Sequence, residues 1–147
     1  MEQAVRELFA RYEAFFRKAL AGEMDAAQMR AEARRLYAPA FVGATPAGVV
    51  SGRMGAKFLR GMAEGYEHYR RIGTRKMKIR HLRVEPVDEW HAMAHVGWAA
   101  TYARDDLAET KIDFEVHYLV QVLDGKARIF GWMSGDEEAV LKSHGAI

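Results

Sequence analysis

The residues from Lys111 to Trp132 constrain the fold more than any other stretch of the sequence. Alternate positions up to Leu123 form two series, and successive side chains of a strand point to opposite faces of a sheet. One series mixes acids, a histidine and leucines, whereas the other is apolar with a single hydroxyl. The apolar series is Ile112, Phe114, Val116, Tyr118, Val120 and Val122. This pattern predicts a long strand with one face buried.

The dipeptide Asp124-Gly125 follows this strand and is typical of a two-residue hairpin turn. Such a turn pairs Leu123 with Lys126, and the same register pairs Tyr118 with Gly131. Because glycine has no side chain, a gap is expected beside the Tyr118 phenol. The helix-facing side of the sheet is then expected to hold Phe114, Val116, Tyr118, Val120, Ile129, Gly131 and Met133. The opposite face is expected to hold His117, Leu119, Phe130 and Trp132.

The composition is that of one ordinary globular domain spanning residues 1–147. Half of the residues are hydrophobic and 29% are charged, which excludes a wholly disordered chain. A formal net charge of +2 gives no reason to expect a nucleic-acid or membrane partner. There is no cysteine, signal peptide or apolar span, so a soluble cytoplasmic protein is expected.

Three helices are expected before the long strands. Apolar residues recur at helical spacing over residues 5–20, and Asp25 with Gln28 forms the capping box of a second helix. Residues 41–50 resemble a short hairpin around a Pro/Gly turn. A third helix is expected between Ser51, as its cap, and Gly73.

Four strands and a short acidic helix are expected in the rest of the chain. The first two strands cover residues 76–87 and 90–104, and a change of parity near Arg80-His81 indicates a bulge. The hairpin described above supplies the other two strands. The acidic helix is expected around residues 136–142. This order predicts an α+β domain with helices on one face of a sheet.

Three segments of the sequence together resemble the nuclear transport factor 2-like superfamily, which includes ketosteroid isomerase-like and SnoaL-like proteins. They are LFARYEAFFRKALAGEMDA, LYAPAFVG and HYLVQVLDGKARIFGWMSGD. The resemblance covers nearly the whole chain. It implies a cone-shaped α+β fold, with three N-terminal helices packed on a curved, mostly antiparallel sheet around a conical pocket. A shared fold does not by itself supply a function.

The residues of ketosteroid isomerases carry over only in part. The resemblance places Tyr12 at the position of the family's hydrogen-bond donor, and Tyr118 at that of its protonated aspartate. Ala44 or Thr45 stands where the family has its general base, and neither side chain accepts a proton at neutral pH. No base is therefore expected in the cavity, and isomerisation of β,γ-unsaturated ketones is not expected.

A pocket for a small, largely apolar molecule is the function that the sequence favours. Its expected lining is Tyr12, Phe16, Phe58, Met62, Tyr66, Trp98, Phe114, Val116, Tyr118, Gly131 and Met133. The rival interpretations are an isomerase, cyclase or dehydratase, and an interaction module whose own aromatic side chains fill the core. A carboxylate or imidazole on the cavity wall would favour the enzyme.

No metal or cofactor is expected, and two other patterns are interpreted as solvated surface. His91 and His95 on one strand would lie about 13 Å apart, too far to share a zinc ion. The basic run from His68 to Arg83 has no nucleic-acid motif beside it.

The face of the sheet away from the helices is expected to form a homodimer. The predicted register gathers His117, Leu119, Phe130 and Trp132 there, and a preceding hairpin centred near Leu107 adds His95. Such an apolar patch with a polar rim is typical of an interface. The alternative is that the tail after Ser134 covers this patch.

Overall fold

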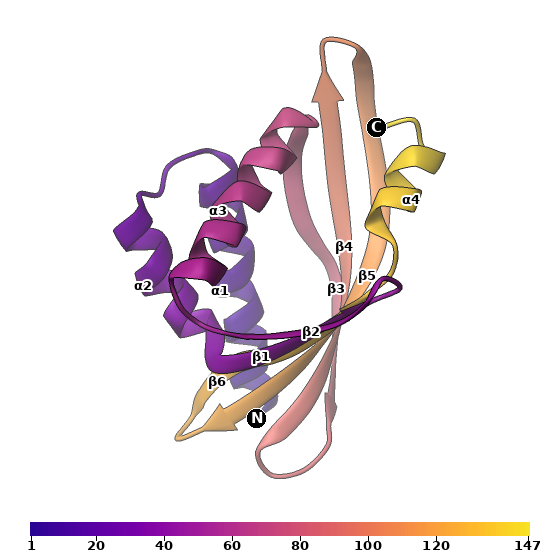
Figure 1. Ribbon diagram of the computed structural model, residues 1–147. Helices are drawn as coiled ribbons and strands as arrows, with labels where there is room; N and C mark the ends of the chain where they lie inside the picture. Colours follow the sequence, from indigo (N-terminus) through magenta and orange to yellow (C-terminus); the bar gives the residue numbers. More distant parts are fainter.

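The computed structural model describes residues 1–147. Its six strands form one curved sheet, and its four helices lie against this sheet (Figure 1). The helices are α1 (Glu2–Leu20), α2 (Ala26–Leu36), α3 (Ala56–Arg71) and α4 (Glu137–Ser143). The strands are β1 (Tyr37–Thr45), β2 (Gly48–Arg53), β3 (Thr74–Pro86), β4 (His91–Arg104), β5 (Leu107–Leu123) and β6 (Lys126–Ser134). The α+β class expected from the sequence is confirmed.

The sheet has the strand order β2-β1-β6-β5-β4-β3 and is mixed. Strand β1 runs parallel to β6, while every other neighbouring pair is antiparallel. The expectation of three N-terminal helices is matched only in part, because the structure has four helices. The position of α3 after the β1–β2 hairpin and that of the short helix α4 after the last strand are those expected from the sequence.

The helix boundaries follow local signals with one exception. Asp25 caps α2 through a full capping box with Gln28, as the sequence predicts. Ser51, expected to cap α3, instead pairs with Val42 inside β2, and Gly55 precedes the helix. Ser51 extends the hairpin instead of capping the helix, because its backbone groups then have hydrogen-bonding partners in the β1–β2 ladder.

A bulge in β6 overturns part of the predicted hairpin register. Leu123 pairs with Lys126 and Val120 with Ile129, as expected from the Asp124-Gly125 turn. Beyond that point the register shifts by one residue, and Leu119 rather than Tyr118 lies opposite Gly131. A shift of one residue sends every later side chain to the other face. Trp132 therefore faces the helices, and the gap predicted beside Tyr118 does not exist.

The observed strand pairing also decides two predictions about the β3–β4 and β4–β5 hairpins. The bulge predicted near Arg80-His81 is confirmed, because the β3–β4 pairing shifts between Ile79 and His81. The β4–β5 turn is centred on Asp105-Asp106 rather than Leu107. His95 consequently lies opposite His117, not beside Leu119.

The core lies between α1, α2 and the concave face of the sheet. Its largest fully buried side chains are Trp98, Phe9, Leu36, Ile129, Val5, Val96 and Val120. In β4 and β5 these belong to the parity that faces the helices, so the alternation read from the sequence defines the inner face correctly. None of the helices is long and apolar enough to cross a membrane.

Candidate functional site

A cavity of about 810 Å³ lies between α1, α3 and the concave face of the sheet. This volume is within the range of small-molecule pockets. Its wall is formed by Tyr12, Phe16, Tyr37, Phe41, Ser51, Gly52, Arg53, Lys57, Phe58, Gly61, Met62, Gly65, Tyr66, Tyr69, Val116, Tyr118, Trp132, Ser134 and Glu137. Nine of these nineteen residues are aromatic, so most of the surface offered to a ligand is apolar.

Helix α3 supplies one wall through a stripe of residues at helical spacing. The stripe is Phe58, Gly61, Met62, Gly65, Tyr66 and Tyr69. A Cβ atom at Gly61 or Gly65 would meet no other atom within 4 Å. A glycine inside a helix costs about 1 kcal/mol relative to alanine. Here it leaves open space on the cavity side of the helix.

Seven of the eleven predicted pocket residues lie on the cavity wall. They are Tyr12, Phe16, Phe58, Met62, Tyr66, Val116 and Tyr118. All seven belong to elements whose inward face the periodicity identifies correctly, namely α1, α3 and β5. That the wall binds a ligand stays a prediction.

The other four predicted pocket residues lie elsewhere. Trp98 is buried beneath the wall, with only 1% of its surface exposed. Phe114 faces a small hollow under α4. Gly131 and Met133 follow the β6 bulge and face outward, beside Leu119 and His117. The same bulge brings Trp132 to the wall, a residue that the sequence analysis assigned to the outer face.

Hydroxyl groups converge at the inner end of the cavity. The Tyr37 hydroxyl donates to the Tyr12 oxygen at 3.2 Å, and the Trp98 indole N–H donates to the Tyr118 oxygen at 3.2 Å. The Tyr12 and Tyr118 rings lie edge to face, with centroids 5.9 Å apart. Because the Tyr12 oxygen accepts from Tyr37, the Tyr12 hydroxyl has its own proton left to donate to a ligand.

Burial keeps these phenols neutral. Loss of solvent raises the pKa of Tyr12, and the hydrogen bond from Tyr37 only partly offsets this. Loss of solvent also raises the pKa of Tyr37, Tyr66 and Tyr118 well above the ordinary value. The cluster therefore acts as a set of hydrogen-bond donors, not as a set of bases, at neutral pH.

Glu137 places a carboxylate on the cavity wall, where no base was expected from the sequence. Its side chain comes from the first turn of α4, and the Tyr69 hydroxyl donates to its Oε2 at 3.4 Å. Burial raises the pKa of Glu137, an effect that the Tyr69 hydrogen bond reduces. A partly buried carboxylate in an apolar cavity can take up a proton from a ligand.

The sequence carries a signal for the helix of Glu137 but none for its position. The acidic run after Gly135 predicts a short helix, and Asp136 caps α4 by accepting a hydrogen bond from the Ala139 N–H. Where that helix docks depends on contacts with β4 and β5. Leu141 packs beside Tyr102 and Ile112, and this packing turns Glu137 inward.

Comparisons with known proteins agree with the fold described above. The model of a family described as NTF2-like protein (DUF6841) matches residues 2–137. The chain belongs to this NTF2-like family. A comparison with curated proteins finds no match. The ketosteroid isomerase-like or SnoaL-like subtype stays a prediction.

Solved structures share the fold of this NTF2-like chain at low sequence identity. An NTF-2 like protein of unknown function from Shewanella oneidensis is 13% identical, with a TM-score of 0.65 over 92% of this chain and 98% of the other. An NTF2-like protein with a cystatin-like fold from Novosphingobium aromaticivorans is 12% identical, with a TM-score of 0.67 over 99% and 88%. At such identities the likeness establishes the fold alone.

The mouth of the cavity in the NTF2-like chain is polar. Arg53 from β2 and Lys57 from α3 are exposed and reach the wall, and neither has a carboxylate within ion-pair distance. Ser51 and Ser134 add hydroxyl groups. A ligand would therefore meet aromatic rings inside and charged or polar groups at the rim.

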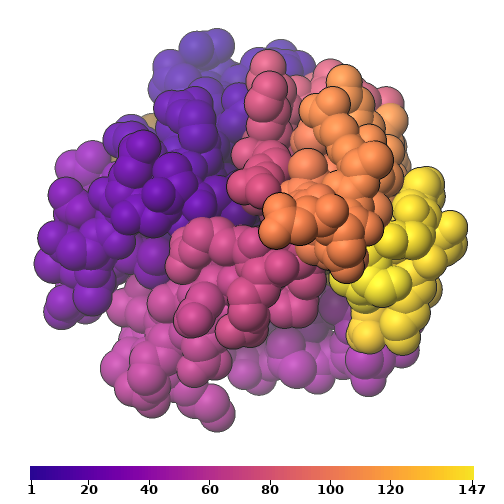
Figure 2. All heavy atoms as spheres, turned by 90° about the horizontal axis from the view of Figure 1, so that it is seen from above, coloured from indigo at the N-terminus to yellow at the C-terminus, as the bar shows by residue number.

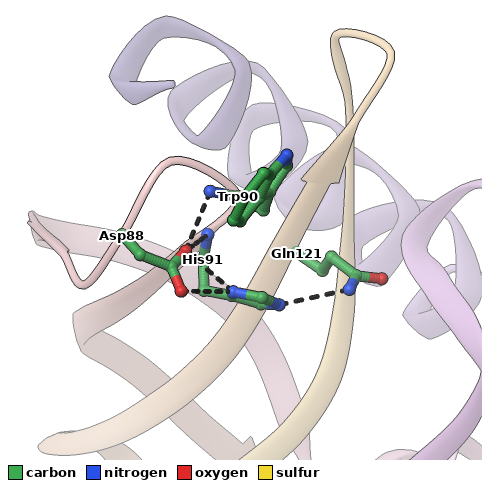
Figure 3. Close-up of polar contacts among 4 residues, drawn as sticks. All are labelled: Asp88, Trp90, His91 and Gln121. Atoms are coloured by element: carbon green, nitrogen blue, oxygen red, sulfur yellow. Dashed lines mark hydrogen bonds and ion pairs between the residues drawn. The ribbon is translucent and has the colours of Figure 1, made fainter.

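The histidines on the outer face of the sheet lie within hydrogen-bonding distance of neighbouring polar side chains. Figure 3 shows His91 between Asp88, whose Oδ1 is 2.8 Å from His91 Nδ1, and Gln121, whose Nε2 is 3.2 Å from His91 Nε2. His95 lies with Nδ1 2.7 Å from Nδ1 of His117, and with Nε2 2.7 Å from Oε2 of Glu85. His91 and His95 thus have separate partners.

Replacing Glu137 with glutamine should raise thermal stability at neutral pH. Because the folded state raises the pKa of Glu137, stability falls as the pH rises through that pKa, and the cost is complete above it. The amide removes this cost. We expect a higher melting midpoint than wild type at pH 7, and a difference that disappears toward pH 4, measured by calorimetry. An equal difference at both pH values would contradict the assigned burial.

Proposed function

We propose that the protein binds a small, largely apolar molecule with one oxygen acceptor in the cavity between α1, α3 and the sheet. The observation that supports this is an aromatic cavity of about 810 Å³ with the Tyr12 hydroxyl among its wall residues. The aromatic rings remove apolar ligand surface from water, which is the main driving force for such binding. The hydroxyl cluster gives orientation, because the hydrogen bond from Tyr37 helps to hold the Tyr12 hydroxyl in place.

Calorimetric titration with two matched probes tests this function. 1-Indanone and indane have nearly the same size and shape, but only the ketone has an acceptor oxygen. We expect the ketone to bind at one site and more tightly than indane, and Tyr12→Phe to weaken the ketone alone. Hydrogen bonds of this kind contribute about 1 kcal/mol, which corresponds to roughly fivefold in affinity. Absence of saturable binding by either probe would overturn the proposal.

Acid–base catalysis on such a ligand is a second candidate, and Glu137 is the observation that favours it. In this reaction the carboxylate takes a proton from the carbon next to a carbonyl, and Tyr12 donates a hydrogen bond to the enolate oxygen. Return of the proton to another carbon would complete an isomerisation. This candidate differs from the family's pattern because its base comes from α4 and not from the position of Ala44 or Thr45.

Deuterium exchange separates the enzyme from the binding protein. In D2O, a base in the cavity should speed the exchange of the hydrogens next to the carbonyl of 1-indanone, followed by proton NMR. We expect exchange above the buffer rate, and its loss in Glu137→Gln with binding retained. Binding without accelerated exchange would leave the protein as a binder alone.

We also propose a homodimer through the outer face of β4, β5 and β6. His95, His117, Leu119 and Phe130 lie on this face, whereas Trp132 belongs to the cavity wall. Met133, 38% exposed, adds apolar surface. The tail leaves the face open, since α4 packs on the inner side near Tyr102. A partly apolar face with paired polar groups suits an isologous interface.

The cytoplasmic location stays a prediction.

Introducing two negative charges on this outer face should dissociate the proposed homodimer. Replacing Leu119 and Met133 with glutamate would bury like charges against their own copies, and we expect a folded monomer in sedimentation equilibrium. Lys111→Glu and Lys126→Glu, both exposed and distant from the face's centre, serve as the control. A wild type that sediments as a monomer at high concentration would overturn the proposal.

A further inference from the structure

A second hollow, of about 530 Å³, lies outside the core between the ends of α1 and α3 and the start of the edge strand β3. In Figure 2, which views the molecule from above, purple atoms from the end of α1 and the following loop lie beside pink atoms of α3 and β3. We call this hollow the basic groove. It is lined by Glu13, Arg17, Leu20, Ala21, Arg70, Thr74, Arg75, Lys76, Met77 and Lys78.

Positive charge is concentrated in the basic groove. Five of its ten residues are arginine or lysine and one is glutamate, which gives a net +4 there against +2 for the whole chain. Because like charges repel, gathering five cations around one hollow disfavours the empty site and favours an anion within it. The groove shares no wall residue with the aromatic cavity.

The cations of the groove keep donors free for a ligand. None of the five has a carboxylate within ion-pair distance. Arg70 donates one N–H to the Ala19 carbonyl at 2.7 Å, and Arg75 donates one to the Ala103 carbonyl at 3.0 Å. Each guanidinium has five N–H donors, so these bonds fix the side chains and leave the other donors available.

The only acid of the groove is already engaged. The Glu13 carboxylate accepts a hydrogen bond from the backbone N–H of Ile79, on the free edge of β3. Alternate N–H groups of an edge strand point the same way, so the Met77 N–H also faces outward from this edge. It adds a backbone donor near Lys76 and Lys78.

A buried hydroxyl without a partner also lines the groove. Thr74 is only 5% exposed, and its Oγ1 makes no hydrogen bond. In the β3–β4 ladder Thr74 lies opposite Tyr102. A buried hydroxyl left unpaired costs free energy, so this end of β3 carries a local cost.

We propose that the basic groove binds a compact small molecule carrying two or more phosphate groups. Arginine forks match phosphate oxygens two at a time, and three arginines with two lysines surround the space. The volume suits a small ligand. The site is independent of the aromatic cavity and of the function proposed for it.

Titration with inorganic tripolyphosphate at physiological salt tests the site. The variant Lys76→Glu with Lys78→Glu reverses two exposed charges of the groove, and Lys111→Glu with Lys126→Glu gives the same change in net charge elsewhere. We expect one-site binding by calorimetry, at least about tenfold weaker in the groove variant and within about twofold of wild type in the control.

Each other outcome would overturn the proposal. Equal weakening in both variants would mean that net charge alone attracts the anion, and no saturable binding would remove the site. A twenty-nucleotide single-stranded DNA is titrated in parallel. If it binds more tightly than tripolyphosphate and also depends on Lys76 and Lys78, the groove belongs to a nucleic-acid surface and not to a small-molecule site.

Discussion

Replacing Gly65 with tryptophan should weaken the binding of 1-indanone in the cavity by at least about tenfold, which is about 1.4 kcal/mol. Gly65 lies on the cavity-facing stripe of α3, and a Cβ there meets nothing within 4 Å. The indole would therefore enter the ligand space, starting from a Cβ that meets no neighbour. The helix itself should gain up to about 1 kcal/mol when glycine is removed. Calorimetric titration and thermal melting measure the two effects.

Gly55→Trp is the matched control for this change. Gly55 precedes the same helix, is absent from the cavity wall, and also has open space around its Cβ position. We expect its affinity for 1-indanone to equal that of wild type. Unchanged affinity in Gly65→Trp would mean that the ligand does not lie where the cavity is.

Replacing Gly131 with leucine should destabilise the fold by about 3 kcal/mol, because overpacking a closed site forces side chains and backbone apart. A Cβ on Gly131 would lie 2.9 Å from Leu119 Cδ1, 2.9 Å from Val42 Cγ1 and 3.0 Å from the Val42 carbonyl oxygen. The last contact is with backbone, so rotation of a side chain cannot relieve it. For a chain of this length we expect the melting midpoint to fall by roughly 10 °C.

Gly135→Leu serves as the control, because its Cβ position is open and the residue is exposed. Its midpoint should stay within a few degrees of wild type. If Gly131→Leu melts like wild type but loses 1-indanone binding, the glycine faces the cavity and the observed register is wrong. The Gly131 prediction thus tests the bulge of β6 directly.

Local patterns in the sequence determined the elements and the inward faces of most of them. Alternation from Ile112 to Val122 identified the inner face of β5, and the Asp124-Gly125 turn set the first four residue pairs of the hairpin. The capping box at Asp25 placed the start of α2. These signals are reliable because they depend on neighbours along the chain or on a period that any strand or helix must have.

The parity of β6 was decided by the tertiary structure. After the bulge, Trp132 points inward against Phe41, with ring centroids 5.3 Å apart, and over Gly43 of β1. β1 lies next to β6 in parallel, a pairing between residues about ninety positions apart that no local pattern in the sequence contains. The bulge turns the indole toward the cavity, where it forms part of the wall, and the two-residue turn alone could not predict this orientation.

The carboxylate of the site was likewise beyond the sequence. The acidic run predicted a helix at Glu137, but the docking of α4 depends on Leu141 and Ala146 packing against β4 and β5, and on Arg104 donating to the Ala146 carbonyl at 2.6 Å. Periodicity reports which face of an element is apolar. It does not report which distant surface that face meets, because the meeting is fixed by the packing of the whole domain.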